Sequence, residues 1–173
     1  MNKNNYIRLA KKAASLQIKE LKKINRVFNK SFIEAVDLIL NCKGKVIFAG
    51  IGKSGLIAKK ISATFSSVGI PSFFCDPAQA LHGDMGQIEK RDILIIFSYS
   101  GNTSELSNML KYANRFRIKI IGVASKPESI LLKASDIKLV LPRVKESDVT
   151  GMVPTSSTTI SLLLGDCLAT TVM

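Results

Sequence analysis

The sequence predicts an α/β domain with a doubly wound, five-stranded parallel sheet flanked by helices, a flavodoxin-like three-layer sandwich. Three observations predict this fold: five short apolar runs, helical segments between them, and polar loops that follow several of the runs. The chain has 173 residues, 46% of them hydrophobic, which suffices for one well-buried core but is short for two ordinary domains. We therefore expect a single domain over residues 1–173.

Two helices are expected before the first strand. Residues 5–29 carry apolar side chains at spacings of three, four and seven, with lysines between them. Ser31 is predicted to cap the second helix, with Glu34 completing a capping box. That helix is expected to end near Gly44.

The five apolar runs are predicted to be strands because they are short, rich in Val, Ile and Phe, and apolar on both alternations. They span 45–50, 71–76, 92–100, 119–125 and 137–142. Helical segments are expected at 54–68, near 78–88, at 104–116, near 127–134 and from about Ser156 onward. This alternation of strand and helix is typical of a parallel sheet.

The net charge is +12, with 25 Lys and Arg against 13 Asp and Glu. The basic residues are spread along the chain, there is no Trp, and aromatic residues make up only 6%, so platforms for base stacking are scarce. We expect no nucleic-acid binding, and instead a solvated basic surface that favours anionic metabolites.

The cysteines, Cys42, Cys75 and Cys167, are far apart and form no CxxC pair, so neither a disulfide framework nor a zinc site is predicted. An Asp76–His82 metal contact stays open, but no metal is expected. The N-terminus lacks the apolar core of a signal peptide, and no apolar run is long enough for a membrane helix. These features predict a cytoplasmic protein without a membrane partner.

GIGKSG, residues 50–55, follows the first predicted strand and opens a helix. Glycines permit a tight turn, and free N–H groups at the helix start favour an anion. A P-loop is excluded, because Lys53 lacks the upstream glycine that its spacing requires. A dinucleotide site stays open, since Asp76 lies where a ribose-binding acid would be expected.

SYSGNTSE, residues 98–105, follows the third predicted strand. Ser98, Ser100, Thr103 and Ser104 supply hydroxyls and Asn102 an amide, beside a turn glycine and a new helix start. This composition fits a cradle for one phosphate dianion, although a serine-rich helix cap is the alternative.

Two further loops carry candidate residues. His82, the single histidine, lies in CDPAQALHGDMG, where a functional role competes with that of a structural hydrogen bonder. Glu146 lies in a polar loop before PTSSTT, a hydroxyl-rich helix start, and its alternative is a solvated surface side chain. Both loops are expected at the rim formed by the strand ends.

Together, GIGKSG, SYSGNTSE, the HGDMG loop and the VKE…PTSSTT segment resemble the sugar isomerase (SIS) domain of D-arabinose 5-phosphate isomerases over residues 5–173. The resemblance implies a cofactor-independent interconversion of D-ribulose 5-phosphate and D-arabinose 5-phosphate through a cis-enediol. This family supplies the precursor of Kdo for lipopolysaccharide and some capsules. The resemblance also implies that full-length members commonly carry a pair of CBS domains, and a histidine of an HPGG-like motif implicated in catalysis, past the point where this chain ends.

The resemblance also implies roles for individual residues. Lys53 stabilises enediolate charge or binds phosphate, Glu105 or Glu146 is the base, with Glu146 favoured, and His82 polarises a sugar oxygen or assists ring opening. The predicted substrate-binding residues are Gly52, Ser54, Ser98, Ser100, Asn102, Thr103, Ser156 and Ser157. The family further implies a homotetramer or dimer, with the histidine loop contributed across subunits.

Two other functions stay open from sequence alone. One is a non-catalytic SIS module that binds a sugar phosphate and reports on it, for which Lys53, Glu105 and Glu146 would have no chemical use. The other is a nicotinamide-binding domain, which would use Asp76 and would need no second anion loop.

Overall fold

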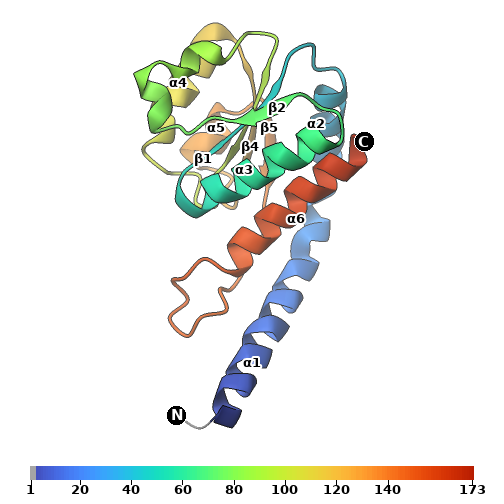
Figure 1. Cartoon of the computed structure of the whole chain (residues 1–173), viewed down its shortest axis with the longest axis vertical. Coiled ribbons are helices and arrows are strands. Elements are labelled where there is room, and N and C mark those ends of the chain that lie inside the picture. Colours follow the sequence, from blue (N-terminus) through green and yellow to red (C-terminus); the bar gives the residue numbers. More distant parts are fainter. Residues whose placement is uncertain (1–2) are drawn as a thin grey trace.

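The computed structural model describes residues 3–173, and its sheet consists of five parallel strands in the order β2–β1–β3–β4–β5 (Figure 1). The strands are β1 (Val46–Gly50), β2 (Ser72–Phe74), β3 (Ile93–Phe97), β4 (Lys119–Ala124) and β5 (Ile137–Val140). The predicted fold class is confirmed. The order is that of flavodoxin-like folds, in which the chain reverses direction across the sheet between β1 and β3.

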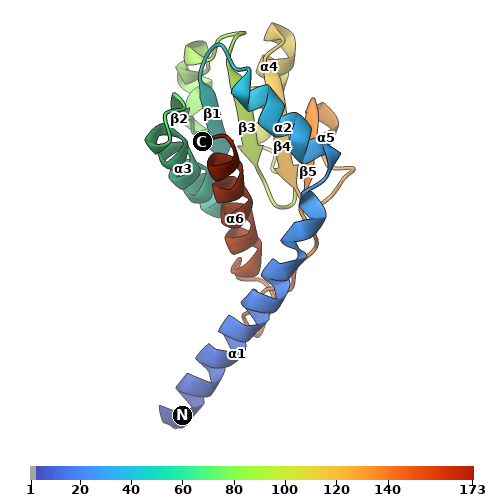
Figure 2. The ribbon, with the colours of Figure 1, turned by 90° about the vertical axis from the view of Figure 1, so that its right-hand side faces the viewer.

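Helices cover both faces of the sheet (Figure 2). One face packs against η1 (Lys22–Val27), α2 (Lys30–Leu40), α3 (Gly52–Ser67) and α6 (Ser156–Thr171). The other face packs against α4 (Leu106–Phe116), α5 (Ile130–Ala134) and the short turns η2 (Gln79–His82) and η3 (Asp84–Gln87). Alternate residues of each central strand enter the two cores, which explains why the strands are apolar on both alternations.

Some predicted element ends differ from the structure. The helix expected over 5–29 is α1 (Lys3–Leu21), and the chain then tightens into η1. Ser31 is not the cap of α2: Asn29 has extended backbone, and its side chain accepts a hydrogen bond from the Ser31 N–H at 2.9 Å. Glu34 therefore makes no capping box and instead lies 3.8 Å from the ammonium of Lys30.

The segment expected to be helical near 78–88 consists of the two separate turns η2 and η3. Gly83, with a φ of 123°, separates them, because this backbone conformation cannot continue a helix. The helix expected from residue 104 begins at Leu106, with Glu105 at the cap position. The helix expected from Ser54 begins two residues earlier, at Gly52.

The carboxyl ends of β1 and β3 lie side by side, with Gly50 in register with Phe97. A side chain at Gly50 would place its Cβ 2.9 Å from the Phe97 carbonyl oxygen and 2.9 Å from the Ser54 backbone. Glycine is therefore required where β1 turns into α3. The two loops that follow these strands open onto the reversal point of the sheet, where ligands bind in this class of fold.

The N-terminal helix α1 extends away from the sheet, and only its second half lies along α6 (Figures 1 and 2). Its exposed apolar side chains include Tyr6, Ile7, Leu9 and Ile18. Over residues 3–173, no helix combines the length and apolarity that crossing a bilayer requires.

Candidate functional site

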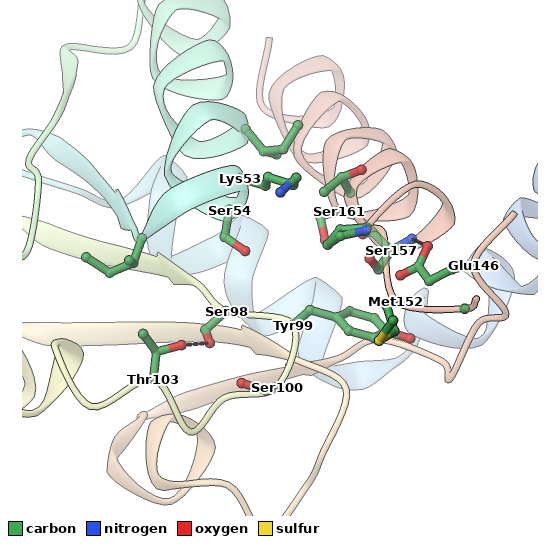
Figure 3. Close-up of a pocket in the computed structure, with 15 residues that line it drawn as sticks. Lys53, Ser54, Ser98, Tyr99, Ser100, Thr103, Glu146, Met152, Ser157 and Ser161 are labelled. Atoms are coloured by element: carbon green, nitrogen blue, oxygen red, sulfur yellow. Dashed lines mark hydrogen bonds between the residues drawn. The ribbon is translucent and has the colours of Figure 1, made fainter. Parts of the chain in front are cut away.

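A cavity of about 420 Å³ lies at the carboxyl ends of β1 and β3 (Figure 3). Three segments meet there: the GIGKSG loop with the start of α3, the SYSGNTSE loop, and the segment 142–155 with the start of α6. The lining residues are Ile51, Lys53, Ser54, Ile57, Ser98, Tyr99, Ser100, Thr103, Glu146, Gly151, Met152, Pro154, Ser157, Thr158 and Ser161. Seven of the predicted site residues are thus brought together: Lys53, Ser54, Ser98, Ser100, Thr103, Glu146 and Ser157.

The SYSGNTSE loop is held in shape by its own hydroxyl groups. The hydroxyl oxygens of Ser98 and Thr103 lie 2.9 Å apart, and the N–H of Gly101 donates to the Ser98 hydroxyl at 3.1 Å. Gly101 has a φ of 69°, a left-handed conformation that lets the loop turn back toward α4. Ser98, Ser100 and Thr103 thus place three hydroxyl groups in the cavity lining, close to the start of α4. This hydroxyl ring suits a phosphate group.

Lys53 and Ser54 belong to the first turn of α3, on the opposite wall of the cavity (Figure 3). Gly52 has a φ of 58° and supplies the turn into the helix. No ion pair involves Lys53 within residues 3–173, so its ammonium group stays available to an anion.

Glu146 is half-buried and lies at the rim of the cavity, in the part that the 142–155 segment forms. Its carboxylate accepts hydrogen bonds from the N–H of Thr155 at 2.8 Å, the Thr155 hydroxyl at 2.9 Å and the N–H of Ser157 at 3.3 Å. Burial acts to raise the pKa of Glu146, but the hydrogen bonds from Ser157 and Thr155 outweigh it, and the pKa is held below its usual value. Glu146 is therefore an anion at neutral pH. From the loop before α6, it accepts hydrogen bonds from backbone N–H groups at the start of that helix.

Tyr99 is a cavity residue that the sequence reasoning missed. Its hydroxyl donates to the carbonyl of Pro142 at 3.3 Å and accepts from the N–H of Val144 at 2.9 Å. Burial raises the pKa of this phenol. Tyr99 thereby ties the loop after β3 to the segment that carries Glu146, and the one available signal was an aromatic residue among the hydroxyls of SYSGNTSE.

Other missed residues complete the cavity. Ile51, Ile57 and Met152 provide apolar surface, and Thr158 and Ser161 add hydroxyls from α6. Ser161 follows Ser157 by one helical turn, so the period of the helix would have predicted it once Ser157 was placed in the site. Gly151 and Pro154 line the cavity from the loop before α6, where periodicity gives no signal.

Five predicted site residues lie outside the cavity lining. Gly52 borders a neighbouring hollow. The Asn102 side chain accepts a hydrogen bond from the N–H of Ile130 at 3.0 Å and so holds α5 instead of facing the cavity. Ser156 is completely buried, and its hydroxyl has no hydrogen-bond partner among residues 3–173. The helical rotation of α6 turns Ser156 inward while Ser157 faces the cavity.

Glu105 and His82 also lie outside the cavity. Glu105 is exposed at the start of α4, and its carboxylate accepts a hydrogen bond from the Ser104 hydroxyl at 2.8 Å. Its own backbone N–H and the Ser104 hydroxyl lower the pKa of Glu105. His82 is exposed at the end of η2. Within one copy of the chain, Glu146 is thus the only one of the two predicted base candidates that lines the cavity.

Asp76, the predicted ribose-binding acid, accepts a hydrogen bond from the N–H of Ala78 at 2.9 Å. It lines a second, more open hollow of about 640 Å³, which shares Lys53 with the first and also includes Lys59 and Phe74. Among residues 3–173, no group of three or more His, Cys, Asp or Glu side chains is arranged to hold a metal ion.

The sequence profile of the SIS domain matches residues 39–171. This chain belongs to the SIS domain family. The match spans β1 to α6 and includes every segment that forms the cavity.

Relatives of this SIS domain include the arabinose 5-phosphate isomerase KdsD of Escherichia coli K12, with 38% identity over 92% of this chain and 48% of the relative. The arabinose 5-phosphate isomerase GutQ of Salmonella typhi is 40% identical over 91% of this chain and 49% of the relative. The chain spans about half the length of the curated relatives it matches. A solved structure of the E. coli CFT073 protein c3406 in complex with arabinose 5-phosphate superposes with a TM-score of 0.95 and 34% identity, over 99% of this chain and 92% of that chain.

Proposed function

We propose that this SIS domain interconverts D-ribulose 5-phosphate and D-arabinose 5-phosphate through a cis-enediol, without a cofactor. One observation carries the proposal: Glu146 and Lys53 line a single cavity together with the hydroxyl ring of the SYSGNTSE loop. The activity named for the curated relatives, and the arabinose 5-phosphate complex of a structure that superposes closely, support this reaction.

The substrate phosphate occupies the hydroxyl ring of Ser98, Ser100 and Thr103 in this proposal. These groups and the nearby start of α4 donate hydrogen bonds to a dianion. Ser54, at the start of α3, approaches from the other side of the cavity. Binding energy from the phosphate, which takes no part in the chemistry, orients the reacting carbons against Glu146.

Proton transfer between C1 and C2 is assigned to Glu146. An ionised carboxylate at the cavity rim can take the proton from one carbon and return it to the other. The ammonium of Lys53 stabilises the negative charge that develops on the enediolate oxygen. Apolar surface from Ile51 and Ile57 lies beside these groups and lowers the local dielectric constant, which strengthens both interactions.

Assembly into a homodimer or homotetramer is part of the proposal. The exposed apolar residues of the projecting half of α1 support it, since an isolated helix of this length is marginal in water. In such an assembly, we assign His82 to the cavity of a neighbouring copy. Sedimentation velocity tests this: a monomer at micromolar concentration would contradict both assignments.

The proposal also places the chain in the cytoplasm, where it would supply the precursor of Kdo. Three free cysteines, Cys42, Cys75 and Cys167, fit a reducing compartment. Fractionation of cells that express the tagged protein tests this: recovery in a periplasmic or membrane fraction would contradict it.

A sugar-phosphate sensor without catalysis is the second candidate. The observation in its favour is that Oε2 of Glu146 accepts three hydrogen bonds at the start of α6, which gives its carboxylate a structural use. The two functions are separated by comparing the wild type with Glu146→Gln, measuring sugar-phosphate binding by calorimetry and turnover by anion chromatography. The isomerase predicts turnover that Glu146→Gln abolishes while binding persists. Binding without turnover in the wild type, at any enzyme concentration, would establish the sensor.

Glu105→Gln serves as the matched control in the same experiment. Because Glu105 is exposed and bonded to Ser104 instead of facing the cavity, its variant should keep most of the turnover. A loss as large as that of Glu146→Gln would transfer the role of base to Glu105.

A further inference from the structure

The second half of α1 contacts the segment that carries Glu146 on both sides of that residue. The carboxylate of Glu20 accepts a hydrogen bond from the N–H of Lys145 at 2.9 Å. The side-chain amide of Gln17 donates to the Ser147 hydroxyl at 3.1 Å. Lys145 and Ser147 are the immediate neighbours of Glu146 in the sequence, so α1 holds the backbone of the residue directly before the proposed base and the side chain of the residue directly after it.

Glu20 is unusual because it is an acidic side chain with only 3% of its surface exposed. It forms an ion pair with Lys23, whose ammonium also donates to the carbonyl of Arg143 at 3.2 Å. Burial of an ionised carboxylate is costly unless partners compensate it, and here the partners are Lys23 and the backbone of the Glu146 segment. The proposed chemistry makes no use of this buried charge.

Gln17 makes a second contact that extends the link to α6. Its side-chain oxygen accepts a hydrogen bond from the Thr159 hydroxyl at 3.3 Å. Gln17 therefore bridges the Glu146 segment and the helix whose first turn binds the Glu146 carboxylate. On the far side of the segment, Tyr99 holds Pro142 and Val144. Residues 142–147 are thus held from several elements, as expected for a preorganised catalytic group.

We propose that Glu20 and Gln17 are positioning residues, which hold the residues on both sides of Glu146 so that its carboxylate stays at the cavity rim. Neither residue lines the cavity, so both act through their contacts with Lys145, Ser147, Lys23 and Thr159 and not by touching the substrate. The inference rests on the proposed function for its catalytic consequence, but the structural link to Glu146 can be measured separately.

The first measurement is the steady-state isomerisation of D-ribulose 5-phosphate by Glu20→Ala, Glu20→Gln and Gln17→Ala. A small displacement of a catalytic group costs up to about a hundredfold in rate, so we expect Glu20→Ala to lower kcat at least about tenfold. KM should change less than about threefold, because the hydroxyl groups proposed to bind the substrate phosphate lie on the SYSGNTSE loop and not on the segment that Glu20 and Gln17 hold. Glu20→Gln should recover most of kcat, since its amide oxygen still accepts from Lys145.

The matched control is Glu34→Gln, which removes a carboxylate from an exposed ion pair with Lys30 on α2. It should leave kcat and KM unchanged. If Glu20→Ala and Gln17→Ala match this control in kcat, the positioning role is overturned.

The second measurement needs no activity: hydrogen exchange of the Thr155 and Ser157 amides, which donate to the Glu146 carboxylate and not to Glu20. Glu20→Ala and Gln17→Ala should each speed this exchange, while the Gly101 amide in the other loop stays protected. Unchanged exchange at Thr155 and Ser157 would overturn the inference.

The two measurements distinguish a failure of the proposed function from a failure of the positioning role. If the wild type isomerises nothing, the proposed function fails, and amide exchange alone then decides whether α1 positions Glu146. If Glu20→Ala does not fold, the half-buried Gln17 still provides the test through Gln17→Ala. Faster exchange at Thr155 and Ser157 in that variant supports the inference, and wild-type exchange contradicts it.

Discussion

The carboxylate of Glu146 binds Thr155 twice, accepting from its backbone N–H at 2.8 Å and from its hydroxyl at 2.9 Å. The Thr155 hydroxyl in turn accepts from the N–H of Ser147 at 2.8 Å. These bonds close the 142–155 segment on itself and attach it to the start of α6. The same bonds hold Glu146 in its ionised form, so one arrangement serves both stability and the proposed chemistry.

Thr155→Val tests this arrangement, because valine keeps the shape of threonine but lacks its hydroxyl. We expect the pKa of Glu146 to rise toward its usual value and the free energy of unfolding to fall by about 1–3 kcal/mol, because the hydroxyl makes two hydrogen bonds, to Glu146 and from the Ser147 N–H. The first is measured by carbon NMR titration of the carboxyl group and the second by urea denaturation. Thr64→Val, whose hydroxyl bonds only within α3, is the control, and an identical Glu146 titration in both variants would contradict the account.

The free energy of unfolding should depend on pH through Glu20 and Glu146, whose carboxyl pKa values are both lowered in the folded protein. The hydrogen bond and charge of Lys23 lower the pKa of Glu20 despite its burial, and hydrogen bonds lower that of Glu146. The unfolded chain, with pKa values near 4.5, then binds protons before the folded one. Both groups therefore contribute to the free energy of unfolding at pH values above about 4.5, and this contribution is lost as the pH falls through their lower pKa values in the folded state.

Urea denaturation of the wild type and Glu20→Gln between pH 6 and pH 3, about the range in which carboxyls titrate, measures this effect. The variant should be less stable at pH 6 and should lose less stability on acidification. Parallel curves for the two proteins would show that Glu20 contributes nothing to the acid dependence.

Lys53 and Lys59 form a natural pair for testing the enediolate role. Both lie on α3 and both line the open hollow near Asp76, but only Lys53 reaches the cavity with Glu146. Lys53→Met should lower kcat/KM about a hundredfold or more, the usual cost of removing a group that stabilises an oxyanion. Lys59→Met should stay within about threefold of the wild type. Equal effects in steady-state assays would show a general charge effect instead of a specific contact.

Gly50→Ala tests the close approach of β1 to β3. The new methyl group would meet backbone atoms of Phe97 and Ser54 at 2.9 Å, and backbone cannot move aside as a flexible side chain can. We expect a loss of about 1–3 kcal/mol in the free energy of unfolding. Gly86→Ala is the control, since a Cβ there meets no atom within 4 Å. Equal urea midpoints for the two variants would contradict the packing.

The fold was predictable because buried parallel strands have a distinctive pattern of continuous apolar residues, as in ILIIF of β3. Element ends were less predictable, because they depend on details such as the extended backbone of Asn29 and the left-handed Gly83. The cavity hydroxyls of the SYSGNTSE loop were predictable from their composition. Tyr99 and Met152 were not, since they enter the cavity through tertiary contacts, whereas Ser161 follows Ser157 by one helical turn.

Among the predicted residues that lie elsewhere, Ser156 and Asn102 show the limit of composition. Ser156 and Ser157 are adjacent and chemically identical, yet the rotation of α6 turns one into the core and the other toward the cavity. Asn102 fits an anion loop by type, but its side chain holds the start of α5. His82 and Glu105 lie outside the cavity of a single copy, and their predicted roles stay predictions.

The most direct test of the central claim is proton NMR of D-ribulose 5-phosphate in D₂O with the purified chain. The account predicts growth of the anomeric signal of D-arabinose 5-phosphate with deuterium at C2, because a carboxylate base exchanges its proton with solvent before returning it to the sugar. Glu146→Gln should show no growth of the anomeric signal and no incorporation of deuterium. If the wild type broadens the sugar-phosphate resonances by binding but forms no product, the chain binds the sugar without isomerising it, and the assignment of Glu146 as the base is contradicted.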